Sequence, residues 1–366
     1  MKAIGIISAN YVSGDFDTLT NKRTLASIPF GGRYRLIDFA LSNMANSGIT
    51  TVGVIAPYNS GSLIDHIGVG KPWSLDKKIG GLFVMPGSVF GVTMSGNRFL
   101  MRDLIANKAF LEKDDADYVV VTGSSDVYNM DYMPLVEAHH KSGRPITLVT
   151  KRVHDAEHYR GFFITKDDDG KVNGISTKSF GDADYFIDCF VVDRKFLLDF
   201  IGWFETLEYM DAIDILDIYL DRFEVGTYEF EGYYGKINSL VTYWRRNMDL
   251  LHKDVVNELF NGERTIYTKV QDEPPADFNA GSNVKNSLIA AGCNIKGTVE
   301  NSIIFRSCNI AEGAVIKNSI ILQHADIGKN VVLDRVIFDK YVTAKEGVEV
   351  RGGNETPIVI DKGSNL

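Results

Sequence analysis

The chain has 366 residues, 45% of them hydrophobic and 24% charged, which is the composition of a folded globular protein long enough for two domains. Its formal net charge of −9 argues against the basic surface that nucleic-acid binding requires, so no nucleic-acid partner is expected. The three cysteines, Cys189, Cys293 and Cys308, are too widely spaced for a zinc motif or a disulfide framework.

The N-terminus begins with a short apolar run, residues 3–7. This run is too short for the core of a signal peptide, and no later apolar run reaches the length of a membrane span. We therefore expect a cytoplasmic protein with no membrane partner.

Residues 1–260 alternate apolar runs of strand length with segments of helical periodicity. The expected strands are residues 3–7, 51–56, 118–121 and 146–150, and the expected helices are residues 33–46, 62–67, 99–113 and 134–142. This alternation predicts a Rossmann-like α/β domain with a mostly parallel sheet. Residues 161–164, 172–175 and 186–192 are candidates for antiparallel strands, and helices are expected at 209–219 and 242–260. A polar stretch with Pro274, Pro275 and Gly281 marks a linker, which we place at 261–285.

Beyond this linker the sequence repeats itself. The segments NSLIAAGCNI, NSIIFRSCNI, NSIILQHADI and DRVIFDKYV begin at residues 286, 301, 318 and 334. Aliphatic residues recur in them every six positions, as at Ile304, Ile310 and Ile316. This period is typical of a left-handed parallel β-helix, and the shared order within the copies argues against antiparallel strands. We assign the β-helix to residues 286–366, with its regular coils ending near Val348 or Val350.

Two long motifs carry a resemblance to a known family. They read IPFGGRYRLIDFALSNMANSGIT at 28–50 and HIGVGKPWSLDKKIGG at 66–81, and TLTNKR at 18–23 and YNMDY at 128–132 fit the same pattern. In these segments, and through the C-terminal repeats, the chain resembles the ADP-glucose pyrophosphorylases, also called glucose-1-phosphate adenylyltransferases. The resemblance implies a nucleotidyltransferase-like first domain. Enzymes of the family join glucose-1-phosphate to ATP, giving ADP-glucose and pyrophosphate for glycogen or starch synthesis.

The resemblance also implies a glycine-rich loop with an arginine after the first strand, which wraps the ATP phosphates. Here the loop reads SANYVSGDFDTL, keeps only Gly14 and contains no arginine. Tyr11, Val12 and Phe16 bring Cβ atoms that would crowd a phosphate held close to the backbone. A family lysine that meets the phosphates aligns with Leu25.

The family also holds Mg²⁺ with two carboxylates and the substrate phosphates. The first carboxylate aligns with Ser125 in the pair Ser124-Ser125; Asp126 follows one residue later, where the turn is expected to aim its side chain elsewhere. The second aligns with Lys236, whose charge would repel a dication. We expect no metal or other cofactor in this chain, and Mg²⁺ only in a catalytic partner. Lys236 could meet a phosphate in place of the metal or stand hydrated in an empty cleft.

Four cations within fourteen residues, Lys22, Arg23, Arg33 and Arg35, suit a small anionic effector. In related enzymes, basic residues of this segment face the β-helix and bind such effectors. The structural alternative is a solvated basic face, or pairing with Asp38 and its neighbours.

Three other residues have less specific signals. Lys178 occupies the place of the family's sugar-phosphate lysine, but the flanking residues depart from that motif, so an exposed lysine is an equal alternative. His66 and Trp73 lie in a glycine-rich loop and are expected to serve the fold or an interface.

Together, these losses predict a regulatory, catalytically impaired subunit of glucose-1-phosphate adenylyltransferase. It would pair with an active homologue in a hetero-oligomer, expected to be a tetramer, that makes ADP-glucose for glycogen. An active adenylyltransferase with relocated ligands is the first alternative. A hexapeptide-repeat acyltransferase is the second, although it normally needs a groove histidine and His324 is the only histidine in the β-helix.

Overall fold

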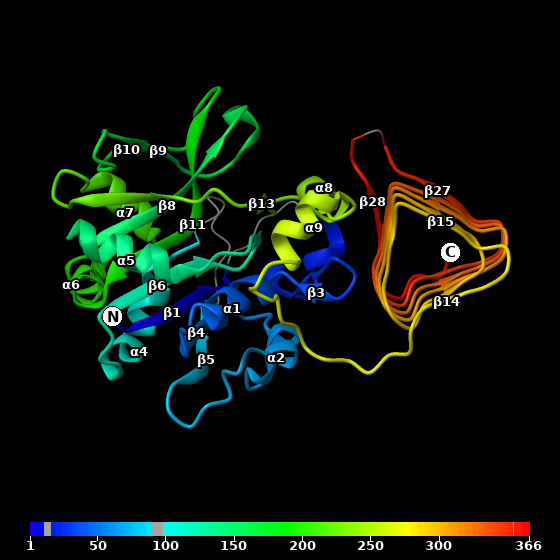
Figure 1. Cartoon of the computed structure of the whole chain (residues 1–366), viewed down its shortest axis with the longest axis horizontal. Helices are drawn as coiled ribbons and strands as arrows, with labels where there is room; N and C mark the ends of the chain where they lie inside the picture. The colour runs from blue at the N-terminus through cyan, green and yellow to red at the C-terminus, as the bar shows by residue number, and fades with distance from the viewer. Residues whose placement is uncertain (11–15, 89–97, 354) are drawn as a thin grey trace.

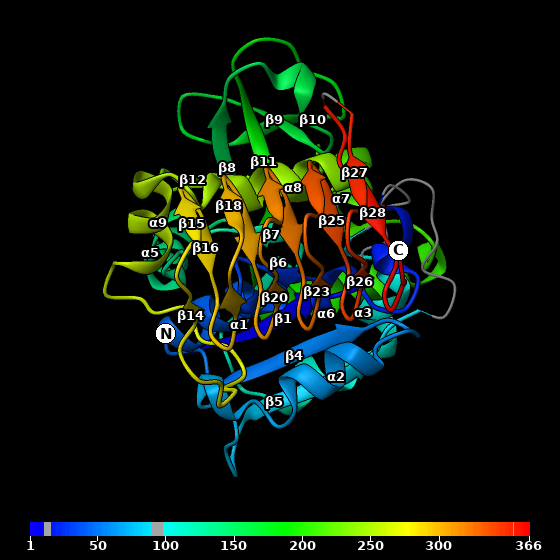
Figure 2. The ribbon, with the colours of Figure 1, turned by 90° about the vertical axis from the view of Figure 1, so that its right-hand side faces the viewer.

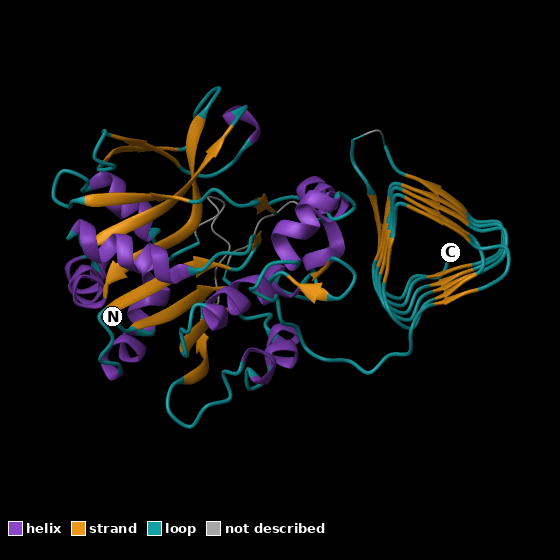
Figure 3. Cartoon of the chain, in the orientation of Figure 1, coloured by secondary structure: helices purple, strands orange, loops and turns teal. Residues whose placement is uncertain are grey.

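The computed structural model describes residues 1–10, 16–88, 98–353 and 355–366. An α/β body is followed by a triangular solenoid of short strands, and helices α8 and α9 lie between the two (Figure 1). Colouring by secondary structure separates them clearly: helices surround the sheet of the body, whereas the solenoid consists of strands and turns (Figure 3). The predicted fold class is confirmed.

A nine-stranded sheet forms the centre of the α/β body. Its main strand order is β10-β9-β11-β6-β1-β4-β5, and β8 pairs with both β11 and β12. The strands are β1 (Ala3–Ser8), β4 (Thr51–Ala56), β5 (Gly81–Pro86), β6 (Tyr118–Gly123), β8 (Ile146–Val153), β9 (Phe163–Lys166), β10 (Val172–Ser176), β11 (Ala183–Asp193) and β12 (Val225–Glu229). Parallel pairing joins β1 to β4 and β6, β4 to β5, and β8 to β12, while β11 runs antiparallel to its neighbours. The central strands are apolar throughout because helices cover both faces of the sheet.

The sequence predicted six helices, whereas the described residues form nine, because two of the expected helices are each divided into two and the helix at 194–203 was not predicted. They are α1 (Ile37–Asn46), α2 (Gly61–Ile67), α3 (Met101–Ala106), α4 (Lys108–Lys113), α5 (Tyr132–Ser142), α6 (Arg194–Trp203), α7 (Ala212–Ile218), α8 (Leu240–Asp249) and α9 (Lys253–Phe260). The helix expected at 33–46 begins late because β3 (Tyr34–Arg35) pairs with β2 (Pro29–Phe30). The helix expected at 99–113 breaks at Asn107, whose side-chain amide donates to the carbonyls of Asp103 and Pro86 at 2.8 and 2.9 Å. That side chain competes with the helical backbone bonds.

The solenoid has three parallel sheets of five strands each. Their orders are β14-β17-β20-β23-β26, β15-β18-β21-β24-β27 and β16-β19-β22-β25-β28. The strands are β14 (Asp277–Phe278), β15 (Asn283–Lys285), β16 (Leu288–Ile289), β17 (Asn294–Ile295), β18 (Thr298–Glu300), β19 (Ile303–Ile304), β20 (Asn309–Ile310), β21 (Val315–Lys317), β22 (Ile320–Ile321), β23 (Asp326–Ile327), β24 (Val332–Asp334), β25 (Val336–Phe338), β26 (Thr343–Ala344), β27 (Glu349–Arg351) and β28 (Ile358–Ile360). The aliphatics with the six-residue period fill its interior, as predicted.

The repeated Asn-Ser dipeptide has a structural cause. Asn301 and Asn318 turn a corner with φ of 48°, a left-handed conformation that asparagine tolerates better than most residues. The serine that follows each asparagine points its hydroxyl at the next coil. The Oγ of Ser287, Ser302 and Ser319 accept, at 3.1 Å, the backbone N–H of Ser302, Ser319 and Val336. One hydroxyl per coil therefore ties each corner to the next.

Both expected ends of the β-helix need correction. Strands β14 and β15 lie inside the segment expected to be a linker, and they already pair with β17 and β18. At the other end β28 pairs with β25, so coiling continues past Val350 to Ile360. The six-residue period is lost in the loop before β28, and for that reason the sequence pattern predicted that the coils end near Val350.

Figure 1 shows the third sheet of the β-helix, which ends in β28, on the side nearest the α/β body. In Figure 2 the solenoid lies in front of the body. The strands of the third sheet carry two adjacent aliphatics: Ile321 points into the solenoid, and Ile320 packs in a cluster with residues of the body. The indole N–H of Trp244 in α8 donates to the carbonyl of Asn318 at 2.8 Å. A Cβ on Gly32, which has a φ of +81°, would lie 2.5 Å from a methyl group of Leu288. Gly32 of the PFGGRYR motif therefore allows the two domains to approach closely here.

Candidate functional site

The carboxyl end of β6 leads into the turn where the resemblance places the first metal ligand. After Ser124 and Ser125 the chain forms β7 (Asp126–Val127), which pairs antiparallel with β13 (Gly235–Lys236). This pairing sets Lys236 opposite Asp126. Since ligands bind at the carboxyl ends of strands in open α/β sheets, this is the position where chemistry would be expected.

Four buried charges meet there: Lys236, Asp126, Asp188 and Arg98, which we call the quartet. The ammonium of Lys236 lies 3.0 Å from Asp126 Oδ1 and also forms an ion pair with Asp188. Arg98 forms an ion pair with the other oxygen of Asp188. None of the four residues is more than 8% exposed. Two cations and two carboxylates leave the quartet with no net charge.

The protonation states follow from the same contacts. Burial and the nearby guanidinium of Arg98 oppose the charge on Lys236, but Asp126 and Asp188 together outweigh them and raise its pKa above the ordinary value. Burial raises the pKa of Asp126, and Lys236 opposes that shift. The hydroxyl of Tyr234 also donates to Asp126, at 3.0 Å. Lys236 is therefore a permanent ammonium inside a closed, neutral cluster.

This set of donors does not fit Mg²⁺. The ion prefers carboxylates and substrate phosphates around it, together with waters. Here an ammonium lies between the two carboxylates, and the Ser124 hydroxyl donates to the Ser8 carbonyl at 2.9 Å. The described ranges contain no group of three or more histidine, cysteine or acidic side chains placed to hold a metal.

Both expectations for Lys236 were wrong. Lys236 neither stands hydrated nor points at an open anion site, because it is buried against carboxylates. Asp126 faces Lys236, and its carboxylate is engaged in that ion pair. Asp188 was not singled out from the sequence at all. The sequence did contain a signal for it, because a lone carboxylate in the apolar strand segment FIDCF needs a cation when the strand is buried. In the structure Asp188 has a φ of 55° and lies where the register of β11 shifts.

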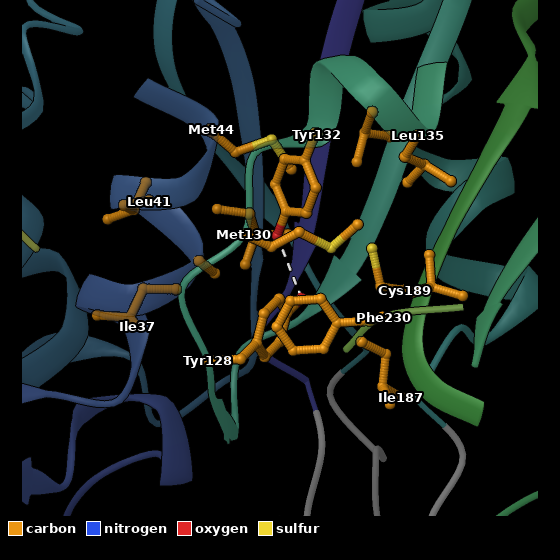
Figure 4. Packing of buried hydrophobic residues seen from close by; sticks show 14 of the residues in the cluster. Ile37, Leu41, Met44, Tyr128, Met130, Tyr132, Leu135, Ile187, Cys189 and Phe230 are labelled. Carbon is orange, nitrogen blue, oxygen red and sulfur yellow. Dashed lines mark hydrogen bonds between the residues drawn. The ribbon is translucent and has the colours of Figure 1, made fainter. Parts of the chain in front are cut away.

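The YNMDY motif next to this turn is retained for packing. Tyr128, Met130 and Tyr132 are buried in the core, with the Tyr128 and Tyr132 hydroxyls 3.1 Å apart (Figure 4). Asp131 caps α5 by accepting the backbone N–H of Met133 at 2.9 Å. The motif therefore builds the core and caps a helix beside this turn.

The remaining positions of the expected phosphate site are only partly described. Leu25 is buried in the core cluster between the two domains, so it takes no part in an open site. Phe16 is buried in the same cluster. Tyr11, Val12 and Gly14 lie outside the described residues.

The four cations of the N-terminal segment divide between two pockets at the junction with the β-helix. Lys22 is exposed and lines a pocket of about 300 Å³ with Arg23. Arg23 itself is buried and pairs with Asp339 of the β-helix at 2.8 Å. Arg33 and Arg35 line a second pocket of about 220 Å³, where the Arg35 guanidinium donates to the carbonyl and hydroxyl of Ser62 at 2.7 and 2.8 Å.

The second pocket also contains cations that the sequence did not reveal, and we call it the junction pocket. Arg306 and Lys340 reach it from the β-helix and Lys269 from the connecting segment. With Arg33 and Arg35 they make five cations, against a single carboxylate, Asp65, among the lining residues. The stacked rings of His324 and Tyr341, 4.9 Å apart, form another part of its wall. Residues far apart in sequence meet here only because successive coils stack.

Other singled-out residues lie away from these pockets or serve the fold. Lys178 is exposed in the turn between β10 and β11. His66 is buried with its Nε2 2.5 Å from Asp38, and the indole of Trp73 donates to Ser42 at 3.2 Å.

The cysteines and the helices yield two plainer results. All three cysteines are buried and free. Within the described part of the chain, no helix is both long and apolar enough to cross a membrane.

Comparison with known proteins gives a consistent picture. The nucleotidyl transferase family matches residues 16–187, and the GlmU-like C-terminal hexapeptide family matches residues 274–356. A glucose-1-phosphate adenylyltransferase of Fervidobacterium nodosum is 30% identical over 98% of this chain and 88% of its own length. A protein of Bacillus subtilis named glycogen biosynthesis protein GlgD is 31% identical over 98% of this chain and 96% of its own. A glucose-1-phosphate adenylyltransferase of Bacillus thuringiensis is 28% identical over 96% and 95%.

Proposed function

Because the chain belongs to the glucose-1-phosphate adenylyltransferase family, we propose that it is a regulatory, catalytically impaired subunit that pairs with an active homologue. The observation that carries this proposal is the quartet. Nucleotidyl transfer needs positive charge directed at the phosphates. In this chain the two cations at the strand ends are already neutralised by Asp126 and Asp188, away from solvent.

The distribution of retained motifs supports the same proposal. Gly32 of PFGGRYR lies against Leu288 of the β-helix, and the side chains of Tyr128, Met130 and Tyr132 in YNMDY fill the core. Where the family needs a carboxylate or a lysine for chemistry, this chain has Ser125, Lys236 and Leu25. The scaffold has therefore been kept and the charges of the reaction have not.

A regulatory role needs a place to receive a signal, and the junction pocket is our candidate. Five cations against one carboxylate leave a net charge of +4, so a small dianion such as a phosphate or a sugar phosphate is the ligand class that suits it. Because the pocket is lined by both domains, a bound anion would contact the α/β body and the β-helix at once.

The partner we propose is an active adenylyltransferase of the same fold, in a hetero-oligomer that makes ADP-glucose for glycogen. Support comes from the relatives: one carries the name of a glycogen biosynthesis protein and others that of the enzyme. The enzyme names also favour the second candidate, an active adenylyltransferase with relocated ligands.

One assay separates the two candidates. The chain is purified alone and together with the catalytic adenylyltransferase from the same genome, and ADP-glucose formation is followed with ATP, glucose-1-phosphate and Mg²⁺. We expect turnover by the chain alone to stay well below about 1 s⁻¹, the low end of ordinary enzymes. We also expect the chain, when present, to change how ADP-glucose formation by the catalytic partner responds to added anions.

The partner alone is the control, and the double variant Arg33→Met/Arg306→Met is a matched test of the pocket. It should still pair with the partner but lose the anion response. Metal-dependent turnover by the chain alone at ordinary enzyme rates would establish the second candidate instead.

A further inference from the structure

Four of the five cations of the junction pocket lie beyond salt-bridge distance of any carboxylate among the described residues: Arg33, Arg35, Arg306 and Lys340. Lys340 is the only lysine of the four, so it is the one that can lose its charge, because a guanidinium stays protonated. Lys340 follows Asp339 at the end of β25, and the two neighbours face different ways: Asp339 lines the pocket with Lys22 and Arg23, and Lys340 lines the junction pocket. Both oxygens of Asp339 are engaged. Its Oδ2 accepts from Arg23 Nη2 at 2.8 Å, and its Oδ1 accepts from the backbone N–H of Lys340 at 2.7 Å.

The ammonium of Lys340 is consequently without a carboxylate within salt-bridge distance among the described residues. Asp65, the carboxylate that lines the same pocket, lies 3.5 Å from Lys269 instead. Lys340 is also partly buried. Partial burial removes hydration from the ammonium, which disfavours the charged form, and no carboxylate partner offsets that loss.

The groups around Lys340 reinforce this effect. Burial, followed by the charges of Arg35 and Arg23, lowers the pKa of Lys340 to about 8; Asp339 opposes the shift and Lys362 adds to it. Arg33, Arg306 and Lys269 add positive charge to the pocket wall, and Asp65 offsets part of it. The histidines His66 and His324 and the phenol of Tyr341 complete the titratable lining.

We propose that protonation of Lys340 controls anion binding in the junction pocket. The inference rests on the anion site of the proposed function and names its regulation. A dianion next to the ammonium supplies the missing counter-charge, so it binds the protonated form more tightly and raises the pKa of Lys340 when bound. As pH rises through the pKa of the free chain, the ammonium is lost and affinity falls. Below that pKa, affinity levels off.

The test uses sulfate, whose charge is constant in the relevant range, so that only the protein titrates. Binding to the full chain is measured by calorimetry at constant ionic strength near pH 7.5 and near pH 9.5, a window above the usual range of histidine. We expect the wild-type affinity to fall by about tenfold or more between the two, since roughly one and a half pH units separate the upper value from the pKa.

Three variants isolate the lysine. Lys340→Arg keeps the charge at both pH values, so its affinity should be nearly independent of pH. Lys340→Met should bind weakly and equally at both. Lys317→Met, on the outer face of the β-helix, should behave as the wild type. Thermal unfolding of each variant shows whether it is folded.

Two results would overturn the proposal: a wild-type affinity that does not change with pH, or a pH dependence in Lys340→Arg as steep as in the wild type. Absence of sulfate binding by every form would overturn the anion pocket as well. None of these results bears on ADP-glucose formation by the chain alone, so the failure of catalytic impairment and the failure of this inference are distinguishable.

Discussion

Lys236 determines the electrostatics at the strand ends of the α/β body. It lies between two buried carboxylates, and Arg98 is the only other cation in the quartet. Without Lys236, the cluster would keep a net charge of −1 in a place closed to solvent. Removing one partner of a buried ion pair is far more costly than the pair is stabilising, because the other charge is left unpaired.

The substitution Lys236→Met tests this imbalance with little change in volume. We expect it to lower the free energy of unfolding by about 3–5 kcal/mol at neutral pH, measured by urea denaturation. The loss should shrink at acidic pH, because burial already raises the pKa of Asp126 and protonation removes the unpaired charge.

Lys108→Met is the matched control, since Lys108 makes an exposed ion pair with Glu112 at 3.5 Å. Its effect should stay within about 0.5 kcal/mol. Equal losses of unfolding free energy in the two variants would show that Lys236 in the quartet stabilises the fold no more than an exposed ion pair does.

The sequence revealed half of this cluster and concealed the rest. Alignment of the family motifs identified Lys236 as the residue in place of a carboxylate. Its pairing with Asp188 joins β13 to β11 across 48 residues, and no local pattern reports such a contact. Lys340 was hidden for the same reason, because its surroundings come from β3, the connecting segment and two other coils.

At the scale of the element, the β-helix depends on one serine ladder. Ser302 is fully buried; its hydroxyl donates to the carbonyl of Glu300 at 2.8 Å and accepts the N–H of Ser319 at 3.1 Å. Ser287 occupies the equivalent corner of the first coil and is only half-buried. The same residue in the same motif therefore differs between the two coils in its access to water.

The substitution Ser302→Ala should cost about 1–3 kcal/mol, because the N–H of Ser319 is left buried without an acceptor. Ser287→Ala is the matched control and should cost less. Its hydroxyl is half-buried, so water can take the place of that hydroxyl and accept the N–H of Ser302. Chemical denaturation followed by circular dichroism measures both. A loss in Ser287→Ala as large as that in Ser302→Ala would mean that burial of the ladder is not what makes it stabilising.

Periodicity predicted most of the elements and placed their ends poorly. The six-residue aliphatic period identified the solenoid, and apolar runs located β1, β4, β6 and β8, but the pattern missed β5, β12 and α6. Asn107 ends a helix through a side-chain hydrogen bond to the carbonyl of Pro86, the last residue of β5. Strand β28 follows a loop that lacks the six-residue aliphatic period. Both boundaries are fixed by contacts between elements, which a periodic pattern does not encode.

For the whole molecule, the decisive feature is that the β-helix presents a second apolar face. Residues such as Ile303, Ile320 and Ile337 pack with Phe30 and Leu36 of the α/β body in one core cluster. The two domains therefore share a core and should unfold together.

The substitution Ile320→Asp places an unpaired charge in that shared core. We expect it to split thermal unfolding, followed by calorimetry, into two transitions, because the domains lose their common core. Val315→Asp, on an outward position of the second sheet, should leave one transition. A single transition in both would show that contacts other than this shared core couple the two domains.

Deletion of residues 286–366 should disrupt the core that the two domains share more severely than Ile320→Asp does. It uncovers the apolar surface of Phe30 and Leu36, so we expect a poorly soluble fragment that no longer binds the partner. A well-behaved fragment that still binds would place the subunit contacts elsewhere.

The closed quartet has a consequence for single substitutions. Each of its members is compensated by another, so changing one alone costs about 3–5 kcal/mol, a large part of the roughly 5–15 kcal/mol that keeps a domain folded. Replacement of Lys236 by a carboxylate would leave three acids facing Arg98 before any metal site existed to use them. Such a substitution would cost stability before it gained a metal site, so stability alone opposes the assembly of a metal site at these strand ends one residue at a time.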